Sequence, residues 1–250
     1  MASAVASSIT VSTDGVVNPS TLPIPPTISL GAYDDESALE SSKANPGGNG
    51  PQSHPQLDNP TTTTNASNNH IITSPYTTPE HFLDLSTLDP ANQFLAKALT
   101  TLTPIRPDYA TAPYTESFNW SSVIETLHDI ASKSNQPWTR RSFYVVAFRS
   151  VLRADANGDR LSLLDERSHA EAVASGGLLK YWFGAKNERR ENLATCVWRS
   201  REDARAGGTG PWHAQARGAA REMYESIVFT TLELVVGEEV GDWEFKAWKD

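Results

Sequence analysis

The chain is poor in the residues that form disulfides, metal clusters and membrane spans. Its 250 residues include one cysteine, Cys196, and two methionines. A lone cysteine excludes an intramolecular disulfide and a zinc cage of several thiolates. We therefore expect Cys196 to pack inside an apolar strand, and we expect neither a metal site nor a bound cofactor. No run approaches the roughly 18 apolar residues that a membrane-spanning helix requires.

Basic charge is also scarce, because 21 Lys and Arg face 30 Asp and Glu. The first 100 residues hold two basic and nine acidic side chains, whereas the rest of the chain is nearly balanced. Nucleic acid is not an expected partner, since phosphate binding needs a basic face. The amino terminus lacks the basic and apolar regions of a secretory signal. We expect a cytoplasmic protein, with the nucleus as a second option, and no membrane partner.

Periodicity is missing from the first part of the chain. Residues 1–78 are dominated by Ser, Thr, Pro, Asn and Gly, as in NPGGNGPQSHPQ and NPTTTTNASNNH. Such a segment buries too little carbon to offset the cost of ordering a backbone, about 1 to 2 kcal/mol per residue. This composition predicts a disordered, low-complexity acidic tail.

Residues 79–138 combine helical patterns with prolines. After Asp89, the stretch DPANQFLAKALTTL has Pro90 in its first turn and apolar residues at helical spacing. The prolines of residues 103–118 predict an extended segment. NWSSVIETLHDIASKS then places apolar side chains on one stripe of a second helix. These residues are expected to form an arm that packs against the domain after it.

Residues 139–250 alternate strands and helices. SFYVVAFRSVL is a predicted strand, and LLDERSHAEAVAS is a helix that ends at Gly176. Two apolar runs within GLLKYWFGAKNERRENLATCVWRS predict a hairpin, after which Ser200 can cap a short helical turn. Pro211 begins a second long helix that we expect to reach Ile227, followed by a last strand in VFTTLELVVG. The order is βαββαβ.

This order predicts a ferredoxin-like α+β fold, in which both helices cover one face of a four-stranded antiparallel sheet. Because strand side chains alternate, we expect the helices to face one set of residues: Val146, Phe148, Leu179, Tyr181, Phe183, Ala194, Cys196, Trp198, Thr230, Leu232, Leu234 and Val236. The opposite, open face should carry the other set: Val145, Ala147, Arg149, Lys180, Trp182, Thr195, Val197, Arg199, Phe229, Thr231, Glu233 and Val235. Such a mixed face suits a dimer interface or a partly polar cavity.

Two stretches resemble known families. SHAEAVASGGLLKYWFG followed by NLATCVWRSREDARAGGTGPWHAQA resembles the dimeric α/β barrel superfamily, which includes the antibiotic-biosynthesis-monooxygenase type, over about residues 142–237. The recurring feature is a strand that ends in Trp-x-Ser, here Trp198 to Ser200, before a helix with an early histidine, here His213. Residues 82–250 as a whole resemble an uncharacterised fungal protein family.

The superfamily resemblance implies a homodimer whose two open sheet faces close into a barrel, with a small-molecule pocket between sheet and helices. Some of its members oxidise polycyclic phenols without a cofactor, and others degrade haem. The haem-degrading members have an asparagine on the first strand and a tryptophan and histidine ten residues apart. This chain has no such asparagine, and His213 directly follows Trp212, so haem degradation is not predicted.

Five residues are candidates for a site that binds an apolar or aromatic ligand. His213 lies in the first turn of a helix, where the dipole favours the neutral form that a general base needs, and it is our candidate catalytic residue. Trp182 on the open face can line a pocket or anchor a dimer. Trp198 and His169 are candidate ligand contacts, although wedging of helix against sheet explains Trp198 and a structural role explains His169. Arg149 is also a candidate, and pairing with Glu233 across strands would explain it.

Three functions stay open. A small-molecule-binding or assembly protein is the first, because no convincing acid–base pair stands at helical or strand spacing. A cofactor-independent monooxygenase acting on an apolar ring is the second. The loop RAGGTG at residues 205–210 gives the third, since it fits the pattern with which N-acetyltransferases hold the pyrophosphate of coenzyme A. In that loop REDA intervenes between strand and glycines, and short glycine patterns arise easily by chance.

Overall fold

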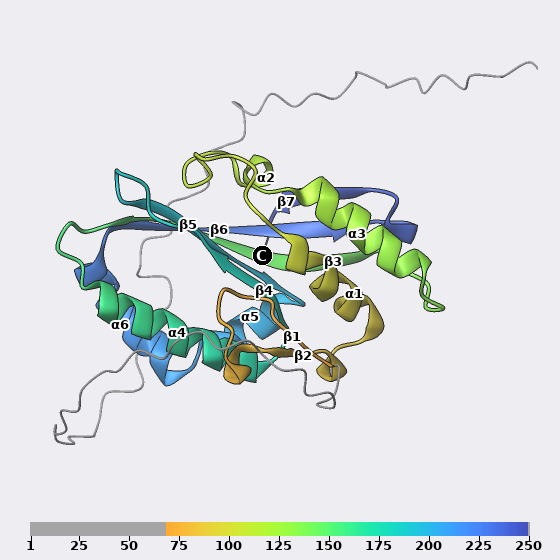
Figure 1. Cartoon of the computed structure of the whole chain (residues 1–250), viewed down its shortest axis with the longest axis horizontal. Helices are drawn as coiled ribbons and strands as arrows, with labels where there is room; N and C mark the ends of the chain where they lie inside the picture. Colours follow the sequence, from red (N-terminus) through yellow and green to blue (C-terminus); the bar gives the residue numbers. More distant parts are fainter. Residues whose placement is uncertain (1–68, 250) are drawn as a thin grey trace, which may run out of the picture. The chain divides into compact units, whose positions relative to one another are not determined.

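The computed structural model describes residues 69–249, so most of the expected tail lies outside the described residues. Its main sheet has five antiparallel strands in the order β4-β5-β3-β6-β7 (Figure 1). They are β3 (Arg141–Leu152), β4 (Leu178–Phe183), β5 (Glu191–Trp198), β6 (Tyr224–Val236) and β7 (Trp243–Ala247). Without β7, this is the strand order of the ferredoxin-like βαββαβ unit. The predicted α+β fold class is confirmed.

Three helices cover one face of the sheet: α4 (Gly158–Ser175), α5 (Arg201–Gly207) and α6 (Pro211–Met223). Each begins at a residue that favours the start of a helix. The side chains of Asn157 and Ser200 accept hydrogen bonds from backbone N–H groups in the first turns of α4 and α5, and Pro211 opens α6. Tyr144 of β3 and Trp198 of β5 belong to the apolar cluster between these helices and the sheet.

The opposite face of the sheet is covered by the chain's own arm (Figure 1). The arm comprises α1 (Pro90–Ala98), α2 (Tyr114–Ser117) and α3 (Trp120–Ser132), and both longer helices were predicted. Leu95 of α1 and Leu127 of α3 are fully buried in the same cluster as Val145 of β3. This cluster is larger than the one under α4 to α6. The face that we expected a second subunit to cover is therefore filled from within the chain.

The predicted facing of β6 is wrong. Leu232 lies opposite Val145 and Leu234 opposite Phe143, so these residues point to the arm and not to α4 and α6. Phe229 lies opposite Phe148 on the helix face, with ring centroids 5.0 Å apart. The prediction gave the more apolar side of β6 to the helices, but the arm supplies the larger core and takes that side.

The facing predicted for the other strands is confirmed with one exception. Leu179 packs in the arm-side cluster because the register of β4 shifts between Leu178 and Lys180. The end of α6 also differs from the prediction, since the helix stops at Met223 and β6 begins at Tyr224. β7 was not predicted. Within residues 69–249, every helix is too short or too polar to cross a lipid bilayer.

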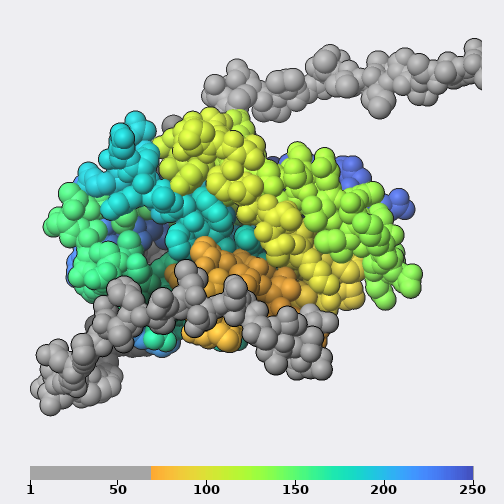
Figure 2. All heavy atoms as spheres, viewed as in Figure 1, coloured from red at the N-terminus to blue at the C-terminus, as the bar shows by residue number. Residues whose placement is uncertain are grey.

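A strap, residues 73–81, runs beside the edge strand β4. The backbone N–H of Tyr181 donates to the carbonyl of Thr73 at 3.0 Å, and Thr73 is almost fully buried. On either side of the strap, β1 (His70–Ile71) pairs with β2 (Leu83–Asp84). Figure 2 shows this part of the chain, in orange, between the green of α4 and the yellow and yellow-green of the arm. Contacts with the domain thus begin before residue 78, where we placed the end of the tail.

Candidate functional site

Polar side chains from three elements meet on the helix face of the sheet, under the strap. Asp165 of α4 accepts hydrogen bonds from the hydroxyls of two tyrosines. Tyr181 of β4 donates to one carboxylate oxygen at 2.5 Å, and Tyr76 of the strap donates to the other. We call the five residues that gather here the Asp165 cluster: Tyr76, His81, Asp165, His169 and Tyr181.

Burial dominates the electrostatics of this cluster. It raises the pKa of Asp165, although the hydroxyls of Tyr181 and Tyr76 act in the opposite direction by stabilising the anion. The pKa of each tyrosine is raised too, by burial first and by the charge of Asp165 second. The two hydroxyls therefore keep their protons and stay hydrogen-bond donors to the carboxylate.

Two histidines lie next to this carboxyl group. His81 at the end of η2 (Pro79–His81) and His169 of α4 are 1% and 4% exposed, and their Nδ1 atoms are 2.7 Å apart. One Nδ1 must donate and the other accept, depending on the tautomers. Burial, with smaller effects from His81 and His213, lowers the pKa of His169 to about 3. Nε2 of His169 is buried without a hydrogen-bond partner among the described residues.

Aromatic rings enclose the phenol of Tyr76. Its ring stacks on His81 with centroids 4.5 Å apart, and His169 and Phe183 approach at 5.1 and 6.1 Å. Tyr76 and Phe183 both retain contact with solvent. The cluster therefore holds one phenol by ring stacking and by a hydrogen bond to a carboxylate, in a place that opens to the surface.

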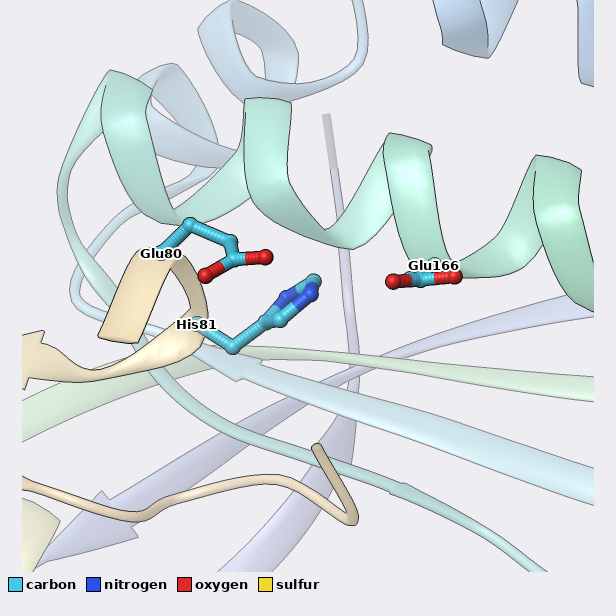
Figure 3. Close-up of side chains that lie close together, drawn as sticks. All are labelled: Glu80, His81 and Glu166. Atoms are coloured by element: carbon cyan, nitrogen blue, oxygen red, sulfur yellow. The ribbon is translucent and has the colours of Figure 1, made fainter. Parts of the chain in front are cut away.

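Two further carboxylates lie at the rim of the cluster. Glu80, His81 and Glu166 each offer one donor atom, and these three atoms lie within 4.8 Å of one another. Figure 3 shows the His81 ring pointing toward Glu166, with the Glu80 carboxylate beside it. Hydrogen bonds from its own backbone and from Thr78 lower the pKa of Glu80, with His81 and Arg167 adding to the effect. Among the described residues, this is the group whose donors could hold a metal ion.

His213, the predicted general base, is paired with a carboxylate. Its Nδ1 lies 3.0 Å from Glu171 of α4, and Glu171 also accepts the backbone N–H groups of Trp212 and His213. Burial would raise the pKa of Glu171, but these hydrogen bonds outweigh it and hold the pKa below its usual value. His213 is thus part of the cap that Glu171 forms on α6, and a role in catalysis stays a prediction.

Trp182 and Arg149 lie on the arm side of the sheet, away from the Asp165 cluster. Trp182 packs edge-on against Phe118 and Tyr109, with centroids 4.9 and 5.4 Å apart. The guanidinium of Arg149 donates to the backbone carbonyls of Tyr109, Ala110 and Ala112. Glu233 lies opposite Tyr144, on the other face of the sheet, so the expected Arg149–Glu233 pair does not form.

Trp198 and the glycine loop are packed together. The space beside Gly207 is filled by the Trp198 ring, because a Cβ there would lie 2.4 Å from its Cη2 atom. A Cβ on Gly210 would meet the Glu171 carboxylate, which already caps α6. A pyrophosphate at this helix start would compete with that carboxylate. The RAGGTG loop thus has a packing explanation, and the wedge explanation fits Trp198.

Of the five predicted residues, the structure brings only His169 into the Asp165 cluster. Tyr76 and His81 were missed because they lie within or next to the segment that we took for a disordered tail. Asp165 and Tyr181 were seen as parts of elements but not as partners. Their place on the helix face could have been read from strand alternation and from the helical spacing of Asp165 and His169.

Comparison with known proteins places the chain among fungal relatives. The family profile described as PB2B2.08-like matches residues 72–247. The UPF0643 protein PB2B2.08 of Schizosaccharomyces pombe is 38% identical over 185 residues, which cover 70% of this chain and 83% of that protein. The resemblance to a fungal family, predicted over residues 82–250, is confirmed.

Solved structures with a similar arrangement are smaller. Rv0793 from Mycobacterium tuberculosis aligns with 22% identity and a TM-score of 0.32, over 37% of this chain and 93% of that one. SnoaB, a cofactor-independent oxygenase from Streptomyces nogalater, aligns with 12% identity and a TM-score of 0.30, over 36% and 89%. At these scores the likeness adds no argument about activity or assembly.

Proposed function

Because this chain belongs to the PB2B2.08-like family, whose name states no activity, we propose a function from its own residues: it binds a small molecule with a phenolic ring in the Asp165 cluster. One observation carries the proposal. The cluster already binds a phenol, the side chain of Tyr76, by stacking on His81 and by a hydrogen bond to Asp165. A free phenol of similar size would find the same contacts if the strap withdrew Tyr76.

The chemistry of the cluster supports a phenolic ligand over a purely apolar one. A buried carboxylate needs hydrogen-bond donors, and Tyr181 supplies one that does not depend on the strap. The second donor comes from the ligand when Tyr76 leaves. A ligand without a hydroxyl would leave one oxygen of Asp165 unpaired, which costs about 1 to 3 kcal/mol.

A cofactor-independent oxygenase is the second candidate function, and one observation favours it. The sequence showed no acid–base pair, but the structure places Asp165 and the His81–His169 pair around the bound phenol. Asp165 would hold the phenolic hydroxyl by a hydrogen bond that leaves electron density on the ring, and dioxygen would be the oxidant. Binding alone and binding with oxidation share this site and differ in whether the ligand is consumed.

The first experiment is native mass spectrometry of the full chain purified from its own host, with and without denaturant. We expect a small organic mass that denaturation releases and that Asp165→Asn protein lacks. Asp155→Asn is the matched control, because Asp155 is an exposed carboxylate bonded to Arg153. Loss of the organic mass from both variants would contradict the proposal, as would its retention by Asp165→Asn.

Titration with 4-methylphenol, the side chain of tyrosine as a free molecule, tests the same pocket by ligand-observed NMR. The wild-type chain should bind it saturably, and Tyr76→Ala should bind more tightly because the competing side chain is gone. Adding Asp165→Asn to Tyr76→Ala should weaken binding again. Binding by Tyr76→Ala alone, with none by the wild type, would refute a native phenol site, since an emptied cavity takes up its missing ring in any case.

We also propose the homodimer that the superfamily resemblance implies, and native mass spectrometry reads its mass in the same experiment. Because α1 and α3 cover the sheet face expected at the interface, the second copy must use another surface or displace the arm. A chain that stays monomeric at micromolar concentration would end this proposal.

Location in the cytoplasm or nucleus stays a prediction that fluorescence microscopy of the tagged chain can test.

A further inference from the structure

Glu80, His81 and Glu166 form a donor set of mixed chemistry. His81 and Glu80 are neighbours on η2, whereas Glu166 comes from α4, more than eighty residues later in the chain. Their donor atoms lie within 4.8 Å of one another, yet no hydrogen bond or ion pair joins His81 to either carboxylate in the described structure. Figure 3 shows the Glu80 carboxylate beside the His81 ring, and the ring pointing toward Glu166.

The distances between these donor atoms suit a bound metal ion better than a direct hydrogen bond. A hydrogen bond between nitrogen and oxygen spans about 2.7 to 3.2 Å. Two metal–ligand bonds of about 2.1 Å, at a tetrahedral angle, place their donor atoms about 3.4 Å apart. The three side chains would need to close by about 1 Å or somewhat more to bind an ion, a shift that the exposed Glu80 side chain can make.

His81 is held as metal-bound histidines usually are. Such histidines donate the ring N–H that is not bound to metal to a fixed acceptor, which sets the tautomer and the ring orientation. Nδ1 of His81 lies 2.7 Å from Nδ1 of His169 and can donate to it. That choice leaves the lone pair of Nε2 free on a ring that is 1% exposed, and within residues 69–249 this nitrogen has no hydrogen bond.

We propose that Glu80, His81 and Glu166 bind one divalent ion of the zinc type, with His169 as the residue that positions His81. One imidazole and two carboxylates are ligands that Zn²⁺ accepts, and water can complete the four-coordinate shell. The ion joins the strap to α4, because two ligands come from η2 and the third from the helix. The metal proposal does not depend on the phenol proposal, although His81 belongs to both sites.

Isothermal titration of the full chain with Zn²⁺, after treatment with a chelator and removal of any affinity tag, tests the site. The wild type should bind one ion per chain. Glu166→Gln and Glu80→Gln should each weaken binding at least about tenfold, since each removes an anionic ligand. These two variants change partly or fully exposed side chains, so they should fold. His128→Gln is the matched control, because His128 lies beside a carboxylate, Asp129, on an exposed helix face.

Zn²⁺ affinity that is unchanged in Glu80→Gln and Glu166→Gln, or lost equally in His128→Gln, would overturn the proposal. So would the absence of stoichiometric binding to the wild type. X-ray absorption at the zinc edge gives a direct readout, for which we expect one imidazole nitrogen among oxygen donors. A sulfur ligand would point to Cys196 and refute the assignment. Asp165→Asn should lose 4-methylphenol but keep Zn²⁺, so the two proposals can fail separately.

His169→Asn tests the positioning role. It should keep the stoichiometry of one ion and lower the affinity roughly 10- to 100-fold, as removal of a partner behind a metal-bound histidine does. Circular dichroism establishes that the variant is folded before it is titrated. Unchanged Zn²⁺ affinity in folded His169→Asn would refute the part of the proposal that concerns His169.

Discussion

Replacing Lys180 by methionine should stabilise the protein at neutral pH. Lys180 lies on β4 opposite Val197, on the face that the arm covers, and only 7% of it is exposed. Within residues 69–249, its ammonium group has no hydrogen bond or ion pair. Burial lowers the pKa of Lys180 to about 8 from 10.5. Methionine fills the same space without a charge.

The size of the effect follows from this shift in pKa. The folded state disfavours the charged amine by about 2.5 pKa units, and each unit corresponds to about 1.36 kcal/mol. At pH 7 the unfolded state binds the proton more tightly, so Lys180 lowers the free energy of unfolding by about 3 kcal/mol. Stability lost in this way returns as pH rises from 8 to 10.5, where the unfolded chain also gives up the proton. Lys180 should lower the free energy of unfolding by about 2 kcal/mol at pH 9 and by less than about 1 kcal/mol at pH 10.

Urea unfolding followed by tryptophan fluorescence, at pH 7, 9 and 10, measures this difference between Lys180→Met and the wild type. Lys186→Met is the control, because Lys186 is exposed in the loop between β4 and β5, and it should shift stability by less than about 0.5 kcal/mol at every pH. A gain at pH 7 that shrinks at pH 10 is the expected pattern. Destabilisation by Lys180→Met, or a gain that does not vary with pH, would refute the reasoning.

Three other substitutions test single contacts. Arg149→Met should lower the free energy of unfolding by about 3 kcal/mol, because it leaves the buried carbonyls of residues 109–112 unpaired. Amide hydrogen exchange in that turn should become faster, and unchanged exchange would contradict this prediction. Glu171→Ala should lower the free energy of unfolding in urea by about 1 kcal/mol, since the first turn of α6 loses its acceptor. Gly207→Ala should lower the free energy of unfolding by about 1 to 3 kcal/mol, because its Cβ meets the Trp198 ring. The ring must then shift, so the near-ultraviolet circular dichroism spectrum should change, and an unchanged spectrum would contradict this reasoning.

Helix starts were predictable because their signals are local. Asp89 before Pro90 marks the start of α1, and its side chain accepts backbone N–H groups of that helix. Ser200 and Pro211 mark α5 and α6 in the same way. Each signal depends on residues within one helical turn, so no knowledge of the rest of the fold was needed.

Side-chain facing in β6 was not predictable from the strand alone. Its alternation says which residues share a side, but not which side meets which layer. Leu232 and Leu234 were given to α4 and α6 because the arm was not expected to cover the sheet with a larger apolar surface. β7 carried a usable sign, the alternation of Trp243 and Phe245 with charged residues, which we did not read as a strand.

The Asp165 cluster shows the limit of sequence patterns for a site. His169 was a candidate, but its partner His81 is 88 residues away and Tyr76 still further. Neither separation corresponds to a helical or strand period, so only the fold reveals the contact. Composition also gave the wrong prediction for the first part of the strap, which we took for disordered tail. Thr73 and Tyr76 hold it in place through contacts with residues far away in the sequence.

The position of the arm has a consequence for how the protein is made. A ribosome releases α1 and α3 before any strand of the sheet that they cover, and β6 and β7, which complete the buried face, emerge about a hundred residues later. At typical rates of synthesis this takes on the order of ten seconds, during which apolar helix faces lack their partner. β3 must likewise wait for β5 and β6, and such distant pairings form slowly. We expect the nascent chain to need chaperones until its last strands are available.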